Sequence, residues 1–164
     1  MNFTADWLKG RLHYDPLTGQ FKWLVNVARR SPAGSVAGTF EARGYIRISI
    51  EGRKYLAHRL AWLYMTGEWP KNQIDHRDLN ASNNAWSNLR EATHGQNIAN
   101  QGARKNNLSG WKGIYFRHKR RKWRAAIYIE SRKVDLGLFA CPAAAHLAYL
   151  LAAVRHFGEF ARGR

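Results

Sequence analysis

Residues 74–97 read IDHRDLNASNNAWSNLREATHGQN, and this stretch decides how the N-terminal half folds. Asp75 and His76 close a short segment that follows a Lys-Asn turn, which is typical of a brief strand. Asn88 comes 12 positions after His76 and opens a second short extended piece. The asparagine-rich residues between them indicate a loop, because Asn side chains readily hydrogen-bond nearby backbone groups. We therefore expect two short strands joined by a polar loop.

A helix is predicted directly after the second strand. Thr93 and Gln96 match the capping-box pattern, in which each side chain bonds the other residue's backbone N–H at a helix start. Asn97 then falls one turn inside that helix. A strand–loop–strand–helix hairpin would bring Asn97 back toward the two strands.

Four side chains are expected to meet in this hairpin: Asp75, His76, Asn88 and Asn97. Carboxylate and amide oxygens suit a hard divalent cation, and a neighbouring imidazole can serve as a general base near neutral pH. The alternative is that the His and the asparagines only satisfy turns, since Asn is common in loops. The spacing of all four, together with the charge of the chain, favours the metal and base interpretation.

Charge narrows the class of partner. The 164 residues include 27 Lys and Arg against 11 Asp and Glu, a formal net charge of +16, while 45% hydrophobic and 23% charged residues are ordinary globular values. Residues 101–164 hold 14 basic and 3 acidic residues, so this shorter part is the more basic. Such an excess repels itself unless a polyanion compensates it, which predicts a nucleic-acid partner and no membrane. The single cysteine, Cys141, excludes an internal disulfide and a Cys-rich zinc site.

The region before the hairpin shows turn and strand patterns. Tyr14–Gln20 has the Asp-Pro-x-x-Gly composition of a turn. Alternating apolar residues predict strands at 21–25 and 45–50, the second joined to Arg53–Leu56 by a two-residue Glu51-Gly52 hairpin. A helix with apolar residues at helical spacing should follow from Leu56 and stop at Gly67.

The C-terminal half is predicted to be a separate α+β domain. Residues 101–110 are polar and basic, and we expect a linker there that includes Arg104 and Lys105. Three alternating strands follow, and a helix begins at Pro142. The stripe expected to cover the sheet consists of Ala144, Leu147, Leu151 and Val154.

The opposite face of that sheet should be basic and aromatic. We expect DNA contacts from sheet residues Tyr115, Arg117, Arg124, Tyr128 and Lys133, from the turn residues Lys119 and Arg120, and from the linker residues Arg104 and Lys105. A β-ribbon can enter the major groove, where Arg reads guanine edges. The alternative is an ordinary face of solvated charges.

Residues 74–97 resemble the HNH nuclease motif in the form found in bacteriophage homing endonucleases, and YLAHRLAWLYMTGEWP at 55–70 is similar to what precedes that motif. GWKGIYFRHKRRKWRAAI at 110–127 and VDLGLFACPAAAHLAYLLAAVRHFGEFA at 134–161 resemble the Apetala/ethylene-response-factor (ERF) DNA-binding domain. These resemblances imply an HNH nuclease domain over 1–100, with a ββα-metal core at about 71–100, and an ERF-type domain over 111–164. The nuclease domain would begin with a small β-rich region and a helix.

The resemblance also implies roles for single residues. His76 matches the general base, Asp75 the acidic metal ligand, Asn97 the second ligand, and Asn88 the central Asn that fixes the loop and orients the His. One divalent ion, Mg²⁺ or Mn²⁺, would occupy each site. One position differs, because Leu79 stands where the family's loop often has Gly, and a requirement for positive φ would strain a Leu.

The sequence and the resemblance together predict a divalent-metal-dependent endonuclease. Hydrolysis of duplex DNA would leave a 5′-phosphate and a 3′-hydroxyl, and the C-terminal sheet would position the enzyme. The expected setting is a monomer in the cytoplasm of a bacterial host, encoded by a phage. A non-catalytic DNA-binding regulator that keeps the HNH module as structure and a basic RNA-binding protein are the alternatives. Only the endonuclease predicts cleavage.

Overall fold

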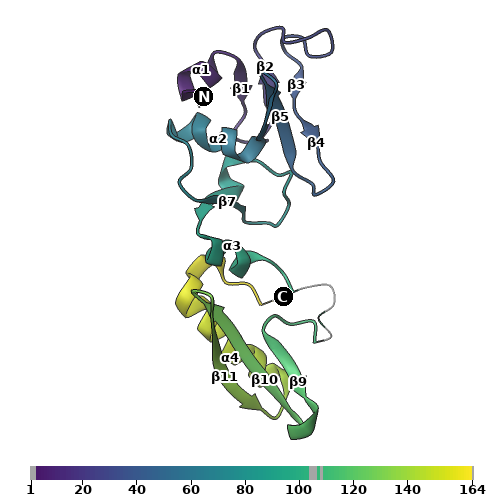
Figure 1. Ribbon diagram of the computed structural model, residues 1–164, viewed down its shortest axis with the longest axis vertical. Coiled ribbons are helices and arrows are strands. Elements are labelled where there is room, and N and C mark those ends of the chain that lie inside the picture. Colours follow the sequence, from purple (N-terminus) through teal and green to yellow (C-terminus); the bar gives the residue numbers. More distant parts are fainter. Residues whose placement is uncertain (1–2, 104–106, 108, 164) are drawn as a thin grey trace. The chain divides into compact units, whose positions relative to one another are not determined.

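The computed structural model describes residues 3–103, 107 and 109–163. The chain divides into two compact units, Met1–Glu91 and Ala92–Arg164. Both contain short helices and small antiparallel sheets, which confirms the predicted α+β class (Figure 1). In the described part of the chain, no helix is long and apolar enough to cross a membrane.

The first unit builds its core from two small sheets and two helices. One sheet has the order β1-β2-β3 and the other β4-β5-β6. Figure 1 shows α1 and α2 next to each other, and both contribute to one hydrophobic core with the strands. The elements are α1 (Ala5–Lys9), β1 (Leu12–Tyr14), β2 (Phe21–Trp23), β3 (Val36–Ala37), β4 (Thr39–Phe40), β5 (Ile46–Ile50), β6 (Arg53–Leu56) and α2 (Ala57–Thr66).

Two sequence signals in this unit are confirmed by backbone geometry. Ile50 pairs with Arg53 across a two-residue turn, and both Glu51 (φ +49°) and Gly52 (φ +76°) are left-handed, as a type I′ hairpin turn requires. Helix α2 ends at Gly67, whose φ of +85° lets its N–H bond the carbonyl of Leu63. Local turn chemistry was therefore enough to place these boundaries.

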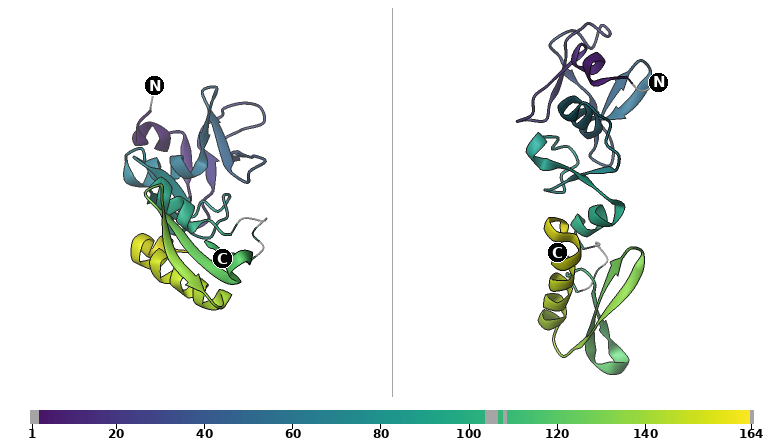
Figure 2. Two further views of the ribbon diagram at one scale, coloured as in Figure 1. Left: turned by 60° about the horizontal axis from the view of Figure 1, so that its bottom comes forward. Right: turned by 90° about the vertical axis from the view of Figure 1, so that its left-hand side faces the viewer.

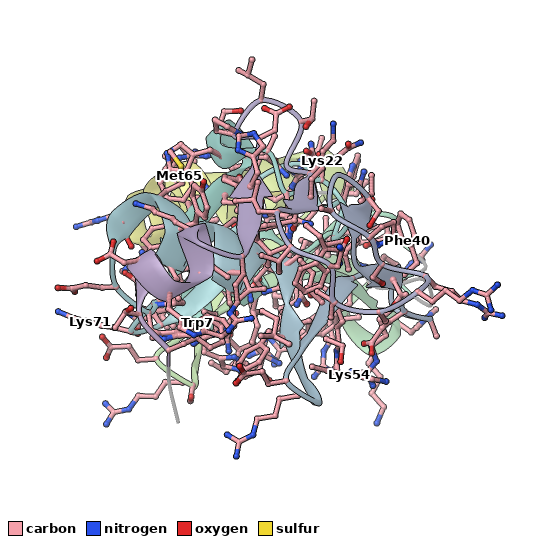
Figure 3. The ribbon with its side chains drawn as sticks, turned by 90° about the horizontal axis from the view of Figure 1, so that it is seen from above. Trp7, Lys22, Phe40, Lys54, Met65 and Lys71 are labelled. Carbon is pink, nitrogen blue, oxygen red and sulfur yellow. The ribbon has the colours of Figure 1, made fainter. Side chains whose placement is uncertain are left out.

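The hairpin that contains the candidate site closes the first unit. Strand β7 (Gln73–His76) is hydrogen-bonded to β8 (Leu89–Ala92), and the 3-10 helix η1 (Trp86–Asn88) precedes β8. Asn88 thus ends a helical turn rather than opening an extended piece. Figure 3 labels three lysines of the first unit, Lys22, Lys54 and Lys71, all of which are exposed.

The second unit is a three-stranded antiparallel sheet packed against a helix. The sheet order is β11-β10-β9, and Figure 2 shows α4 running along one face of it. Helix α3 also belongs to this unit, because Ala99 packs with Phe160. The elements are α3 (His94–Asn100), β9 (Ile114–Arg117), η2 (His118–Arg120), β10 (Lys122–Ile129), β11 (Arg132–Phe139), α4 (Pro142–Phe157) and η3 (Gly158–Phe160).

The boundary between the two units falls between Glu91 and Ala92 in the sequence, ahead of the expected linker at 101–110. Of that linker, Arg104 and Lys105 lie outside the described residues. The division into a nuclease domain over 1–100 and a DNA-binding domain over 111–164 stays a prediction.

The predicted sheet-facing stripe of α4 is wrong. Leu147, Leu151 and Val154 are 57%, 64% and 58% exposed, and Ala144 is exposed as well. The buried face consists instead of Ala145, Tyr149 and Ala153.

The physical reason is a fit between one large side chain and two small ones. A Cβ built on Gly113, in the turn before β9, would lie only 2.3 Å from the Tyr149 ring, so the ring has room there because residue 113 is a glycine. Ala145 and Ala153 on either side let the helix approach the sheet closely. Because the helix is apolar nearly all round, periodicity alone could not choose between the two faces.

Candidate active site

Strand β7 buries both residues of the predicted acid–base pair. Asp75 is 4% exposed and His76 is 6% exposed. The Asp75 carboxylate oxygen Oδ2 accepts a hydrogen bond from Nε of Arg90 on β8 at 2.9 Å, and Arg90 is itself 7% exposed. A buried carboxylate needs such a partner, because transfer of an uncompensated charge from water is very costly.

Polar and aromatic groups surround the His76 ring. Its Nε2 lies 3.2 Å from Oδ1 of Asn84, a fully buried side chain. The ring of His58 meets it edge-on, with centroids 5.1 Å apart and an interplanar angle of 88°, and Tyr45 is 6.1 Å away. Burial lowers the pKa of His76.

His58 comes from the start of α2 and is also buried. Burial, followed by the neighbouring His76, lowers the pKa of His58 to about 3. Its imidazole is therefore neutral across the physiological range and packs as a polar ring.

Asn88 fastens both ends of the loop that follows His76. Its Nδ2 donates to Oδ1 of Asp78 at 3.0 Å and to the carbonyl of Asn83 at 2.8 Å. Its Oδ1 accepts from the Asp78 N–H at 3.1 Å, and its carbonyl accepts from the Arg77 N–H at 2.9 Å. These bonds join the two ends of the loop to each other, and the bonds of the Asn88 side chain go to Asp78 and Asn83. The catalytic role that the resemblance implies for Asn88 stays a prediction.

The sequence did not identify Asn84 as the side chain that contacts His76 through Nε2. Asn84 is one of several loop asparagines, and no spacing rule separates it from Asn80 or Asn83. Its contact depends on how the loop is folded, so the local sequence held no signal for it.

Leu79 adopts the left-handed backbone conformation that the family's glycine at this position would adopt more easily. Its φ is +68°, in the left-handed region, and its side chain is 44% exposed. The loop holds it there through the Asp78 carboxylate, which accepts from the Asn80 N–H at 2.8 Å and from Asn83 Nδ2 at 2.7 Å. Burial raises the pKa of Asp78, but these bonds and that from Asn88 outweigh it and lower the pKa overall.

Helix α3 begins as predicted. Thr93 Oγ1 accepts from the Gln96 N–H at 3.3 Å, and Gln96 Oε1 accepts from the Thr93 N–H at 2.8 Å, which completes the capping box. Asn97 lies one turn inside this helix, in the second unit. Its approach to Asp75 stays a prediction.

The donor chemistry fits a hard cation. Asp75 offers a carboxylate and Asn97 an amide oxygen, and Mg²⁺ commonly takes one or two carboxylates and completes its shell with water and substrate phosphate. Among the described residues no group of three or more His, Cys, Asp or Glu forms a metal cluster.

The open face of the C-terminal sheet carries the predicted basic and aromatic residues. The Lys133 ammonium bonds the Tyr115 hydroxyl at 3.2 Å, and the Arg117 guanidinium lies over the Tyr115 ring at 5.9 Å. Tyr128 pairs with Lys133 and is 64% exposed, while Lys119 and Arg120 stand exposed on η2.

Arg124 on this face has a partner within the sheet. Its Nε and Nη2 bond the two carboxylate oxygens of Asp135 at 3.1 and 2.6 Å. The Asp135 hydrogen bond raises the pKa of Arg124 further. Both side chains remain accessible, so the pair holds the guanidinium in place at the surface.

Comparison with known proteins finds a family that resembles the segment around this site. Residues 55–99 match the family model described as HNH endonuclease. Over 77 residues the chain is 36% identical to Protein 3.8 of Escherichia phage T7. The aligned region covers 46% of this chain and 64% of that protein.

A solved structure, described as DNA binding and cleavage by the HNH homing endonuclease I-HmuI, is also similar. It shares 25% identity with a TM-score of 0.45, over 62% of this chain and 57% of that one. The chain thus spans less than two thirds of the length of either relative.

Proposed function

We propose that the protein is a divalent-metal-dependent DNA endonuclease. The observation that carries this proposal is the buried Asp75-His76 pair at the end of β7, inside the segment that matches the HNH endonuclease model. Burying an acidic and an imidazole side chain side by side is costly for stability alone, which supports a functional role for the pair.

The residues have distinct roles in this proposal. Asp75 with Asn97 would hold one Mg²⁺ or Mn²⁺ ion, which supplies charge neutralisation at the scissile phosphate and the leaving 3′ oxygen. His76 accepts a proton from the attacking water as the water oxygen bonds phosphorus and the bond to the 3′ oxygen breaks, and the departing 3′ oxygen takes up a proton from solvent water. The products are a 5′-phosphate and a 3′-hydroxyl. Asn88 holds the loop that follows His76 in place through its bonds to Asp78 and Asn83.

The C-terminal sheet positions the enzyme on duplex DNA in this proposal. Tyr115, Arg117 and Lys133 form one connected cluster on the open face. Phosphate contacts from such a basic face fix register, while Tyr and Arg side chains are available for the groove. Arg124 is bonded to Asp135 at the surface, and in this proposal its guanidinium exchanges that carboxylate for a DNA phosphate or base.

The test is nicking of supercoiled plasmid with Mg²⁺ by the full chain. His76→Ala should lower the rate about 10²- to 10⁴-fold, the usual worth of a general base. DNA affinity should stay unchanged, because the side chain is buried. His156→Ala, which removes an exposed His from α4, is the matched control and should cut at the wild-type rate. Equal cutting by His76→Ala would remove the proposed base.

The alternative of a non-catalytic DNA-binding regulator has one observation in its favour. The Arg90 guanidinium already compensates the charge of Asp75 at 2.9 Å, as in a purely structural ion pair. Tight duplex binding with no cleavage in Mg²⁺ or Mn²⁺ would support the regulator. Metal-dependent nicking would exclude it.

A further inference from the structure

The turn of the first hairpin touches the loop of the candidate site. We use the term clasp for residues 14–19, which are the last residue of β1 and the turn that leads to β2. The Tyr14 hydroxyl donates to the carbonyl of Asn84 at 2.7 Å, and this bond is buried although the two residues are 70 positions apart. The carbonyl of Pro16 accepts from the Trp86 N–H at 2.9 Å.

A glycine completes the clasp. Gly19 has a φ of +73°, and a Cβ built on it would stand 2.2 Å from the carbonyl carbon of Asn84 and 2.3 Å from the nitrogen of Ala85. The turn therefore lies directly on the Asn84–Ala85 peptide. Asp15 keeps the turn rigid, because its carboxylate accepts from Leu17 N–H and from Thr18 Oγ1 at 2.9 and 2.7 Å.

The residue that the clasp holds is not explained by folding alone. Asn84 is completely buried, and its Nδ2 has no hydrogen-bond partner among the described residues. A buried amide group without a partner destabilises a fold, so selection for stability favours an apolar side chain here. Its Oδ1 points at His76 Nε2 from 3.2 Å. The side chain of Asn84 therefore contacts the proposed base, His76.

We propose that the clasp is a positioning device for His76, acting through Asn84; this inference rests on the proposed function of His76. An amide oxygen only accepts hydrogen bonds, so the contact places the ring proton on Nε2. Nδ1 is then the unprotonated nitrogen that takes the proton from water. The clasp lies at residues 14–19, outside the segment 55–99 that matches the HNH family model. A hairpin before the nuclease domain thus sets the tautomer and orientation of the base.

Gly19→Ala tests the clasp, with Gly52→Ala as the matched control. Both glycines have left-handed φ, +73° and +76°, so both variants carry the same backbone strain. Only Gly19→Ala drives a methyl into the Asn84–Ala85 peptide, since nothing lies within 4 Å of a Cβ on Gly52. We expect single-turnover nicking by Gly19→Ala to fall on the order of 10²-fold below the control, the usual effect of a misplaced catalytic group.

Two further variants separate positioning from loss of fold. Tyr14→Phe removes only the hydroxyl that donates to the Asn84 carbonyl. Tyr64→Phe is its control, because it removes a hydroxyl from a ring that packs against Tyr14 and leaves the Tyr14–Asn84 bond in place. Asn84→Leu keeps the volume but removes the acceptor. Nicking should fall in Tyr14→Phe and Asn84→Leu but not in Tyr64→Phe, while thermal unfolding of Asn84→Leu should show a stable fold.

The decisive readout does not depend on cleavage. In ¹⁵N spectra of the full chain, the His76 ring should carry its proton on Nε2, and Asn84→Leu and Gly19→Ala should mix the two tautomers. A wild-type proton on Nδ1, or tautomers unchanged in both variants, would overturn the positioning role. If the wild type cuts no DNA while the tautomers shift as expected, the endonuclease proposal fails and the clasp stands.

Discussion

The β7–β8 hairpin and the C-terminal sheet both carry polar clusters, but the cluster in the hairpin is buried and the cluster on the sheet is exposed. In the hairpin, Asp75 and Arg90 pair at 2.9 Å with exposures of 4% and 7%. On the sheet, Arg124 and Asp135 pair at 2.6 Å in contact with solvent. Buried polar groups must be satisfied in one geometry, whereas exposed ones can exchange partners. The first arrangement suits chemistry at fixed distances, and the second suits binding.

The largest expected difference between the two regions is in how much each ion pair contributes to the free energy of unfolding. Arg90→Leu leaves the Asp75 carboxylate buried beside an apolar chain, and we expect unfolding in urea to lose about 3–5 kcal/mol, the usual cost of breaking a buried pair. Arg124→Leu is the control on the sheet, and its transition midpoint should hardly move because that pair is solvated. Equal losses in the two variants would contradict the contrast between the regions.

The second prediction concerns affinity. Replacing Arg117, Lys119 and Arg120 by Ala removes three exposed cations from β9 and η2. The slope of log affinity against log salt should shrink by about 2–3, since each phosphate contact contributes about 0.9. The single-turnover rate at saturating DNA should stay the same. A changed rate with an unchanged salt slope would place these residues outside the DNA interface.

The third prediction uses the buried His58. Its folded-state pKa of about 3 lies below its ordinary value of 6.5, so only the unfolded chain takes up this proton between those values. Stability is therefore complete above about pH 6.5 and falls as the pH decreases, by up to about 1.4 kcal/mol per unit for this group. His58→Gln should flatten the dependence between pH 4 and 6. His13→Gln, an exposed site, should leave it as in the wild type.

Sequence patterns predicted what local chemistry determines. The Thr93–Gln96 capping box and the Glu51-Gly52 turn were predictable, because each depends on residues within four positions. The buried face of α4 was not, because it depends on a recess at Gly113 that receives Tyr149 from a different element.

The same limit applied to the site. Asp75, His76 and Asn88 could be proposed from spacing, since the motif itself encodes them. The role of Asn84 could not, because it is set by Tyr14, 70 residues earlier, and by the depth of the loop. Contacts between distant segments leave no periodic trace in the sequence.

The smallest predicted effect tests whether the loop of the site is strained. Leu79 holds a φ of +68°, a conformation that costs a non-glycine residue about 1–2 kcal/mol. Leu79→Gly removes that strain but adds flexibility to the unfolded chain, so the net gain in stability should be at most about 1 kcal/mol. Leu17→Gly, at an exposed leucine that is not left-handed, should only destabilise. If both variants lose stability equally, the Asp78 and Asn88 network accommodates Leu79 without strain. A gain confined to Leu79→Gly would show that the loop around His76 keeps a strained conformation that the solvated sheet face does not need.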